Sequence, residues 1–248
     1  MNILALIPAR MGSSRFPGKP MAEILGKPMI GHVYDRVKQN NYMNKVVVAT
    51  CDNVIYEYIK SIDGYAMMTS DKHERASDRC SEALLKIEKE DKIRYDIVVM
   101  VQGDEPMVHP DMISEAVEPL IDDPEILITN LLGRIKSEEE FHDINTIKVV
   151  CDNNKNALYF SREPIPTHSF NNLSMGKQVP IIPFRRDFLI KYNELKPTPL
   201  EIAESVDMLR ILEHGINIIM VPTSYETYAV DTLEDLKKVQ SYMKPFPS

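Results

Sequence analysis

The sequence lacks the features that several classes of protein require. Its three cysteines, Cys51, Cys80 and Cys151, are far apart and show no Cys-x-x-Cys spacing, which indicates neither a disulfide framework nor a zinc site. No apolar run approaches the roughly 20 residues of a membrane helix, and no basic residue precedes the short apolar run at the start. We therefore expect a cytoplasmic protein that does not bind a membrane.

Positive charge is also scarce. The 29 lysines and arginines are outnumbered by 37 acidic residues, which gives a formal net charge of -8 at pH 7. Nonspecific binding to nucleic acid or to an anionic membrane needs a positive field, so we expect neither partner. A chain of 248 residues can bury a substantial core, and we favour one α/β domain that carries a smaller lobe.

Two common phosphate-binding loops are missing. No Gly-x-Gly occurs among the nine glycines, which excludes the dinucleotide-binding fingerprint. A Walker A loop has four residues between its glycine and its Gly-Lys pair, whereas five residues separate Gly12 from Gly18 here. Pro20 then stands where that loop needs serine or threonine. Any phosphate site in this chain is therefore of another kind.

One loop nevertheless has the composition of an anion site. The apolar run 3–7 stops at a segment that contains Arg10, Arg15, Lys19 and two glycines. Each of these charges taken alone is more often a solvated surface charge. Glycines let the backbone approach a ligand, and three cations clustered at a strand end can neutralise several phosphate oxygens. We interpret the loop as a binding site for a triphosphate.

Short β-branched runs alternate with segments of helical period. Runs 3–7, 46–50, 97–101, 126–129 and 216–221 predict strands, and segments 30–37, 199–209 and 233–243 predict helices. Continuous apolar strands separated by helices imply a mostly parallel sheet with ligands at the carboxyl ends of its strands. The alternation breaks between about 138 and 192, which we interpret as a lobe inserted into a single domain that spans residues 1–248.

Two aspartates from distant segments are candidate metal ligands. Asp104 follows the predicted strand 97–101, although an aspartate there is as often the cap of a turn. Asp231 is more ambiguous, because Asp231 or Thr232 is equally suited to cap the last helix, with Glu234 or Asp235 in its first turn. If the two carboxylates lie together, they suit Mg²⁺, which takes few protein oxygens and fills its octahedral shell with water and phosphate oxygens.

The loop has the pattern Pro-Ala-Arg-x-x-Ser-x-Arg-x-Pro-Gly-Lys-Pro between Pro8 and Pro20. With it, the chain resembles the 3-deoxy-manno-octulosonate cytidylyltransferase (CMP-Kdo synthetase) family over almost its full length. Further segments that carry the resemblance are Gln102-Gly103-Asp104-Glu105-Pro106, Ala157-Leu158-Tyr159-Phe160-Ser161-Arg162, Pro199-Leu200-Glu201 and Val230-Asp231-Thr232.

The resemblance implies an α/β, Rossmann-like nucleotidyltransferase fold, with a mostly parallel sheet flanked by helices and an inserted lobe through which two copies pair as a homodimer. It implies transfer of CMP from CTP to a small sugar acid in lipopolysaccharide biosynthesis, with Mg²⁺ as the cofactor. It assigns catalysis to Lys19, Arg10 and Asp104, and the metal to Asp104 and Asp231. The implied nucleotide-binding residues are Ala9, Arg10, Ser13, Arg15, Lys19, Ser77, Asp78, Arg79 and Gln102, and the implied acceptor-binding residues are Arg162, Gln178, Glu204 and Asp207.

The chain departs from the family pattern mainly on the acceptor side. Gln178 replaces a histidine, Ile182-Pro183-Phe184 replaces Tyr-Gly-Tyr, and Met208 replaces a glutamine. On the nucleotide side, Arg75-Ala76-Ser77 replaces Ser-Gly-Thr. The resemblance leads us to expect 3-deoxy-manno-octulosonate as the acceptor, and these departures keep two alternatives open. One is the same transfer to 8-amino-3,8-dideoxy-octulosonate, another ulosonic acid or a phosphonate, and the other is a catalytically silent nucleotide-binding protein.

Overall fold

The computed structural model describes residues 1–13, 15–170 and 175–243. Its contacts divide the chain into two compact units, one formed by Met1–Ser114 with Glu226–Ser248 and the other by Glu115–Tyr225. The lobe expected at about 138–192 falls inside the second unit, which begins earlier and ends later in the sequence. Residues 171–174 of that lobe lie outside the described residues.

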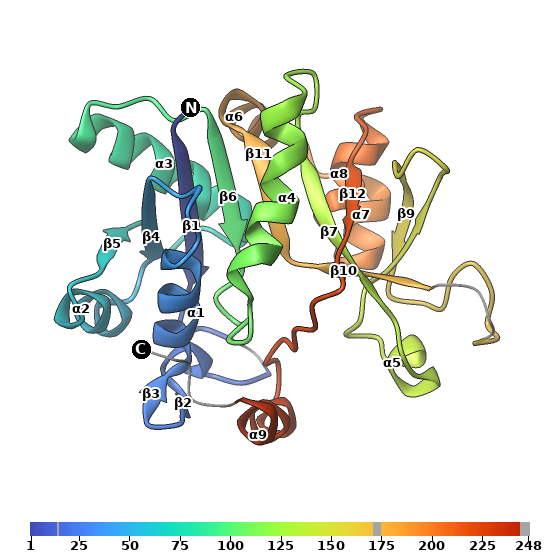
Figure 1. Cartoon of the computed structure of the whole chain (residues 1–248), viewed down its shortest axis with the longest axis horizontal. Coiled ribbons are helices and arrows are strands. Elements are labelled where there is room, and N and C mark those ends of the chain that lie inside the picture. Colours follow the sequence, from blue (N-terminus) through green and yellow to red (C-terminus); the bar gives the residue numbers. More distant parts are fainter. Residues whose placement is uncertain (14, 171–174, 244–248) are drawn as a thin grey trace. The chain divides into compact units, whose positions relative to one another are not determined.

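The first unit is built on four parallel strands in the order β6-β1-β4-β5. The strands are β1 (Ile3–Ala9), β4 (Lys45–Thr50), β5 (Tyr65–Met68) and β6 (Ile97–Val101). Every residue of β1 and β6 is buried, because helices cover this sheet and leave no solvated face at its centre. Figure 1 shows the strands as neighbouring arrows with α1 crossing in front of them. Their carboxyl ends therefore lie at one edge.

Helices of the first unit follow the strands as the alternation predicts. They are α1 (Met29–Lys38), α2 (Asn53–Ser61), α3 (Ala76–Asp91) and α9 (Leu233–Tyr242), with a 3-10 turn η1 (Lys19–Met21) and a small hairpin of β2 (Glu23–Ile24) and β3 (Lys27–Pro28). Helix α4 (Pro110–Asp122) begins in this unit and ends in the second. Both α1 and α3 pack against β1 and β4.

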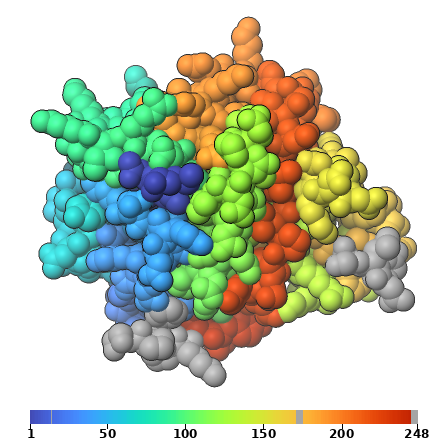
Figure 2. Space-filling view, turned by 45° about the horizontal axis from the view of Figure 1, so that its top comes forward, coloured from blue at the N-terminus to red at the C-terminus, as the bar shows by residue number. Residues whose placement is uncertain are grey.

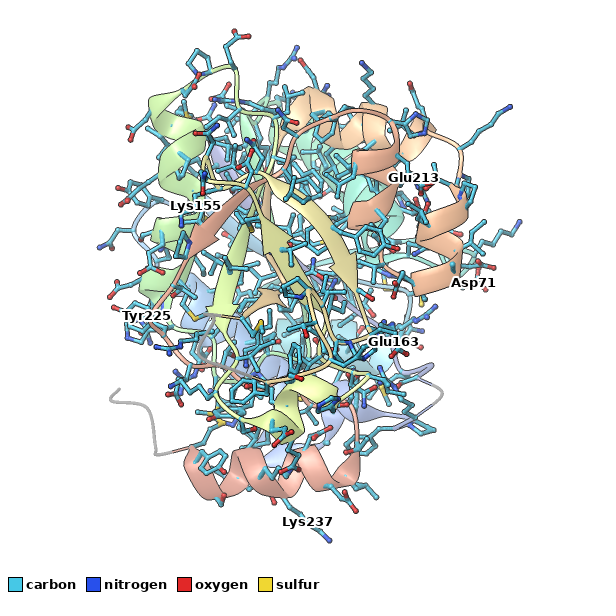
Figure 3. All side chains as sticks on the ribbon, turned by 90° about the vertical axis from the view of Figure 1, so that its right-hand side faces the viewer. Asp71, Lys155, Glu163, Glu213, Tyr225 and Lys237 are labelled. Carbon is cyan, nitrogen blue, oxygen red and sulfur yellow. The ribbon has the colours of Figure 1, made fainter. Side chains whose placement is uncertain are left out.

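The last described residues return to the first unit. Val230, Val239 and Met243 form a buried cluster with Ile24 and Met29, so α9 is held against the β2–β3 hairpin by apolar burial. Helix α9 lies on the surface, as Figure 2 shows in red, and the side chain of Lys237 points outward in Figure 3. The chain that leads into α9 is thereby fixed beside β2 and the start of α1.

The second unit has a mixed sheet in the order β12-β7-β10-β8-β9, in which only β12 and β7 are parallel. The strands are β7 (Thr129–Arg134), β8 (Lys148–Cys151), β9 (Ala157–Ser161), β10 (Gly176–Val179) and β12 (Ile219–Pro222), and β11 (Ile181–Arg185) follows β10. Its helices are α5 (Glu138–His142), α6 (Arg186–Glu194), α7 (Pro199–Glu204) and α8 (Met208–Glu213). Lys155, labelled in Figure 3, sits at the turn from β8 to β9 with a left-handed φ of 66°.

The strand predicted at 216–221 begins later, as β12 at Ile219, and two further predicted elements of the second unit are wrong in their bounds. The run 126–129 predicts a strand, but β7 begins only at Thr129, because the run before it makes one isolated bridge, from Ile128 to Phe184. The helix expected at 199–209 is broken at Ser205, which has a left-handed φ of 53° and ends α7. Helix α8 then starts at Met208. Apolar spacing continues across the break, so periodicity alone does not detect it.

Candidate active site

The loop after β1 is closed by its own backbone. The carbonyl of Met11 accepts hydrogen bonds from the N–H groups of Ser13 and Gly18, both at 2.9 Å. Gly18 has a left-handed φ of 77° where η1 begins, a conformation that favours glycine. The carboxylate of Asp52, just past β4, accepts from the N–H of Met11 at 2.8 Å. The loop is therefore anchored to the neighbouring strand end.

The cations of this loop face different partners. Arg10 follows Ala9, the last residue of β1, and its Nη1 donates to the backbone oxygen of His73 at 3.4 Å. Arg15 is half exposed, and its Nη2 lies 2.9 Å from Oδ1 of Asp231. Among the described residues, no atom lies within 4 Å of the place that a Cβ would take on Gly12. The loop thus leaves room there for a ligand beside its backbone.

Lys19 joins the two predicted metal ligands. Its Nζ lies 2.6 Å from Oδ2 of Asp104 and 3.0 Å from Oδ1 of Asp231, and it also donates to the carbonyl of Val230 at 3.1 Å. Burial lowers the pKa of Lys19, but the charges and hydrogen bonds of the two aspartates outweigh this effect and raise it overall. The structure therefore brings together two carboxylates and an ammonium from three distant segments.

The ambiguity at the start of α9 is resolved. Thr232 is the N-cap, because its side chain accepts from the N–H of Asp235 while the Asp235 carboxylate accepts from the N–H of Thr232. Asp231 is therefore not needed as the cap, and its carboxylate contacts Lys19 and Arg15 instead. Likewise, the side chain of Asp104 faces Lys19 rather than capping a turn.

Gln102 and Gly103 lie between β6 and Asp104. Gly103 is closely packed: a Cβ on it would come within 2.8 Å of the carbonyl oxygen of Pro8, on β1. A glycine is therefore required by the close approach of β6 to β1, and the segment is not simply flexible. Gln102 is half-buried, and its carbonyl accepts from the N–H of Glu105 at 3.3 Å.

Ser77, Asp78 and Arg79 lie in the first turn of α3. Arg79 is buried, and its Nη1 donates to the hydroxyl of Thr69 and, at 3.3 Å, to the carbonyl of Ser70. Ser77 is buried as well, whereas Asp78 is half-buried. Arg79 therefore holds the segment after β5 against α3.

Glu82 fixes the same segment. Its carboxylate accepts from the N–H of Ser70 at 2.9 Å, from the ring of His73 and from Lys86, 2.7 Å away. Burial raises the pKa of Glu82, but these donors outweigh it and lower the pKa to about 2. Because the carbonyl of His73 accepts from Arg10, Glu82 also supports the arginine at the start of the loop after β1.

Two of the predicted acceptor-binding residues meet in the second unit. The carboxylate of Glu204 accepts from the hydroxyl of Ser161 at 2.7 Å and from the N–H of Arg162 at 2.9 Å. The Arg162 guanidinium donates to the carbonyls of Ile144, Glu204 and Ser205 at 2.9, 2.8 and 3.3 Å. Both side chains therefore tie β9 to the end of α7.

Gln178 and Asp207, the other two predicted acceptor-binding residues, contact other partners. Gln178 donates through Nε2 to Oδ1 of Asn130 at 2.6 Å. Asp207 precedes α8, and its backbone carbonyl accepts from the hydroxyl of Tyr192 at 3.2 Å. Each has a structural partner within the second unit.

The departures from the family pattern are largely in the core. Ile182, Phe184 and Met208 are all buried, and the ring of Phe184 packs on those of Phe188 and Tyr192. These three side chains are therefore enclosed in the core of this structure. Of the changed positions on the acceptor side, Gln178 is the one that is half-buried with a polar side chain.

Sequence reasoning missed several supporting residues. Asp52 is not among them, because the sequence places it just past a predicted strand end, as it does Arg10 and Asp104. Lys148 is one: it is fully buried, and its Nζ donates to the carbonyls of Asp143 and Arg162, each at 2.6 Å. Burial is the main cause that lowers the pKa of Lys148. Glu105 and Thr227 are a further pair with no local signal in the sequence.

The described part of the chain holds no cluster of three or more His, Cys, Asp or Glu side chains suited to a metal. The pair Asp104 and Asp231 still fits Mg²⁺, because the two carboxylates converge on one cation and Mg²⁺ needs few protein ligands. Among the same residues, no helix has the length and apolar character to cross a membrane.

Comparison with known proteins agrees with this geometry. Residues 4–218 match the family model described as cytidylyltransferase. The chain is 43% identical to the 3-deoxy-manno-octulosonate cytidylyltransferase of Geobacter metallireducens over 99% of each sequence. It is 41% identical to that of Geobacter sulfurreducens, over 98% of this chain and all of the relative. A solved structure of CMP:2-keto-3-deoxy-manno-octonic acid synthetase complexed with CTP matches with a TM-score of 0.88 and 38% identity, over 97% of this chain and 98% of that one.

The parallel sheet is flanked by helices, and a cationic loop and two carboxylates lie at its carboxyl edge. Together with these matches, this arrangement defines a nucleotidyltransferase. The predicted fold class is confirmed. The chain belongs to the 3-deoxy-manno-octulosonate cytidylyltransferase family, as its motifs indicate.

Proposed function

We propose that this chain transfers CMP from CTP to 3-deoxy-manno-octulosonate and releases pyrophosphate. Membership of the family and the likeness to a CTP-bound synthetase support the reaction. The observation that carries it is the convergence of Lys19 on Asp104 and Asp231 beside the cationic loop. Retention of this cluster argues against a catalytically silent protein.

The reaction needs positioning and charge neutralisation rather than a covalent enzyme intermediate. The acceptor hydroxyl oxygen bonds to the α-phosphorus, the bond from that phosphorus to the leaving oxygen breaks, and the hydroxyl proton is released. Arg10 and Lys19 offset the charge on the departing phosphates, since guanidinium and ammonium groups bind phosphate oxygens strongly. Ser13 and Arg15 complete the loop around the triphosphate.

The remaining nucleotide contacts are proposed from the family pattern. Ala9 ends β1 and Gln102 follows β6, both at the carboxyl edge of the first-unit sheet. Ser77, Asp78 and Arg79 form the first turn of α3, which the Glu82 contacts hold in place. This arrangement suits the nucleoside part of CTP, because strand ends and rigid helix starts are where α/β sheets bind ligands.

Mg²⁺ is the proposed cofactor, with Asp104 and Asp231 as its ligands. When bound, it supplies charge stabilisation to the phosphate and polarises a coordinated oxygen. The two aspartates bring negative charge to the site, and Lys19 keeps that charge compensated while the nucleotide is absent. Arg15 adds a second cation at Asp231.

The acceptor is proposed to bind in the second unit through Arg162, Gln178, Glu204 and Asp207. Because Arg162 and Glu204 also hold each other and the backbone, we expect them to shape the site as well as to contact the acid. The burial of the altered side chains favours the unmodified octulosonate over an analogue.

The test is pyrophosphate release with CTP and a panel of acids. We expect the highest kcat/KM with 3-deoxy-manno-octulosonate, compared with its 8-amino analogue, other ulosonic acids and small phosphonates. A higher kcat/KM with one of these analogues identifies that modified acid as the acceptor. Nucleotide binding without release from any acid identifies a silent nucleotide-binding protein and refutes the proposal.

Three further properties are proposed with this function. A homodimer is supported by large apolar side chains exposed on the second unit, Ile144 at 63% and Leu158 at 60%. Light scattering at micromolar protein checks it, and a monomeric mass contradicts it. Free thiols at Cys51, Cys80 and Cys151 support a reducing cytoplasm, and the named acceptor supports a place in lipopolysaccharide biosynthesis.

A further inference from the structure

The two proposed metal ligands come from segments that do not adjoin in sequence. Asp104 follows β6, whereas Asp231 arrives with the chain that leads into α9. Two carboxylates close to one another repel, and Lys19 compensates this charge only while its ammonium lies between them. Some other contact must therefore hold the two segments at their spacing when ligands change the charge of the site.

A buried hydrogen bond joins the two segments. The hydroxyl of Thr227 donates to Oε2 of Glu105, a residue 122 positions away in the sequence. Glu105 is 2% exposed and Thr227 is 7% exposed. A carboxylate removed from water is costly unless hydrogen bonds stabilise it, so this contact strongly favours one position of Thr227 relative to Glu105.

The bond lies close to both aspartates along the chain. Glu105 is the immediate neighbour of Asp104, and Thr227 precedes Asp231 by one short extended segment. Between them, the N–H of Val230 donates to the carbonyl of Asp104 at 2.9 Å, and the side chain of Val230 is fully buried. Two hydrogen bonds therefore join this segment to Asp104 and Glu105, and the side chain of Val230 adds an apolar anchor.

We propose that the Glu105–Thr227 hydrogen bond sets the separation of Asp104 and Asp231. Glu105 and Thr227 are then positioning residues for the cation site. This inference rests on the proposed function, since it names residues that support the same site. Neither side chain needs to touch the nucleotide. Loss of the bond lets the segment before α9 shift, and the two carboxylates then no longer share one cation at short distance.

The test uses Thr227→Val, which keeps the shape of the side chain and removes the hydroxyl, with Thr227→Ser as the matched control. Binding of Mn²⁺ is measured by electron paramagnetic resonance, with and without CTP, and kcat and KM are measured separately. We expect Thr227→Val to weaken Mn²⁺ binding and to lower kcat, each by about tenfold or more, the equivalent of one hydrogen bond to a charged group. Thr227→Ser should stay within about threefold of the wild type, because it keeps the donor.

A merely structural bond gives a different result. In that case Thr227→Val lowers the melting temperature but leaves Mn²⁺ binding and kcat at their wild-type values below the transition, which overturns the proposal. If Thr227→Val does not fold, Thr227→Ala replaces it, since it also removes the hydroxyl donor. Unchanged Mn²⁺ binding in Thr227→Ala then overturns the proposal, and weakened binding supports it. Because Mn²⁺ binding needs no acceptor, failure of the proposed reaction is seen separately.

Discussion

Replacing Lys19 by methionine separates two effects that one side chain exerts on the site. The ammonium lies 2.6 Å from Asp104 and 3.0 Å from Asp231, the same carboxylates that we propose as metal ligands. It therefore competes with a divalent cation when the nucleotide is absent. In the reaction, the same ammonium neutralises charge on the phosphates. Lys19→Met should accordingly tighten metal binding to the free protein and impair catalysis.

The size of both effects follows from the contacts. Removing one partner of a hydrogen bond between charged groups typically changes the free energy by about 1.5–3 kcal/mol. Side-chain exposures of 14% for Lys19, 25% for Asp104 and 21% for Asp231 imply some solvent screening, so we take about 1.5–3 kcal/mol for the whole cluster. Mn²⁺ should then bind the nucleotide-free variant roughly tenfold to a hundredfold more tightly. The loss in kcat should be about a hundredfold to a thousandfold, as for removal of one charge-stabilising donor.

The pH of the assay follows from the direction of the pKa shift. Because the folded pKa of Lys19 is raised above its ordinary value, its ion pairs are fully formed below about pH 10.5 and are lost only as the pH rises through the folded pKa. At neutral pH the Lys19 ammonium of the wild type is therefore charged and competes with the metal ion for the two carboxylates. Lys19→Arg is the control, since it keeps the charge and should leave Mn²⁺ affinity within about threefold.

Electron paramagnetic resonance with Mn²⁺ gives the affinity, and pyrophosphate release gives kcat. Tighter Mn²⁺ binding together with a strongly lowered kcat supports both roles of Lys19, competition with the metal ion and neutralisation of phosphate charge. Unchanged or weaker Mn²⁺ binding in Lys19→Met would refute the competition, because the carboxylates released from the ammonium are then not the metal ligands. A near-normal kcat would remove Lys19 from the catalytic group.

The remaining predictions concern other parts of the chain. Asp104→Asn and Asp231→Asn should each lower kcat by about a hundredfold or more at saturating Mg²⁺ with an unchanged circular dichroism spectrum, and normal turnover in either removes that residue from the site. Because the folded pKa of Glu82 is about 2, below its ordinary value, its stabilisation is present above about pH 4.5 and is lost as the pH falls toward 2. Urea titrations should show that Glu82→Gln is less stable than the wild type at pH 7 and that the difference shrinks below pH 4.5, and a constant difference contradicts this. Arg210→Met, which removes the charge partner of the fully buried Glu201, should cost about 3–5 kcal/mol of unfolding free energy by calorimetry, and adding Glu201→Leu should restore much of it in the same measurement.

The local apolar pattern predicts an element correctly where the surrounding structure buries the residues that the pattern marks as apolar. The run 97–101 coincides with β6, since a continuous apolar strand is buried on both sides wherever it enters the sheet. The helix expected at 199–209 fails because Ser205 turns left-handed, and α7 is instead held by the buried pair of Glu201 and Arg210. Apolar periodicity reports which residues are buried, but it does not report where the backbone turns between them.

By itself, the sequence determined the alternation of strands and helices, the cationic loop with Arg10, Arg15 and Lys19, and the family to which the chain belongs. These depend on composition and order along the chain, which a local reading recovers. Only the tertiary structure decided that Asp231 faces Lys19 while Thr232 caps α9, and that Glu105 meets Thr227. Such contacts join segments far apart in sequence, and their partners are set by the packing of the sheet, the helices and the returning C-terminal segment together.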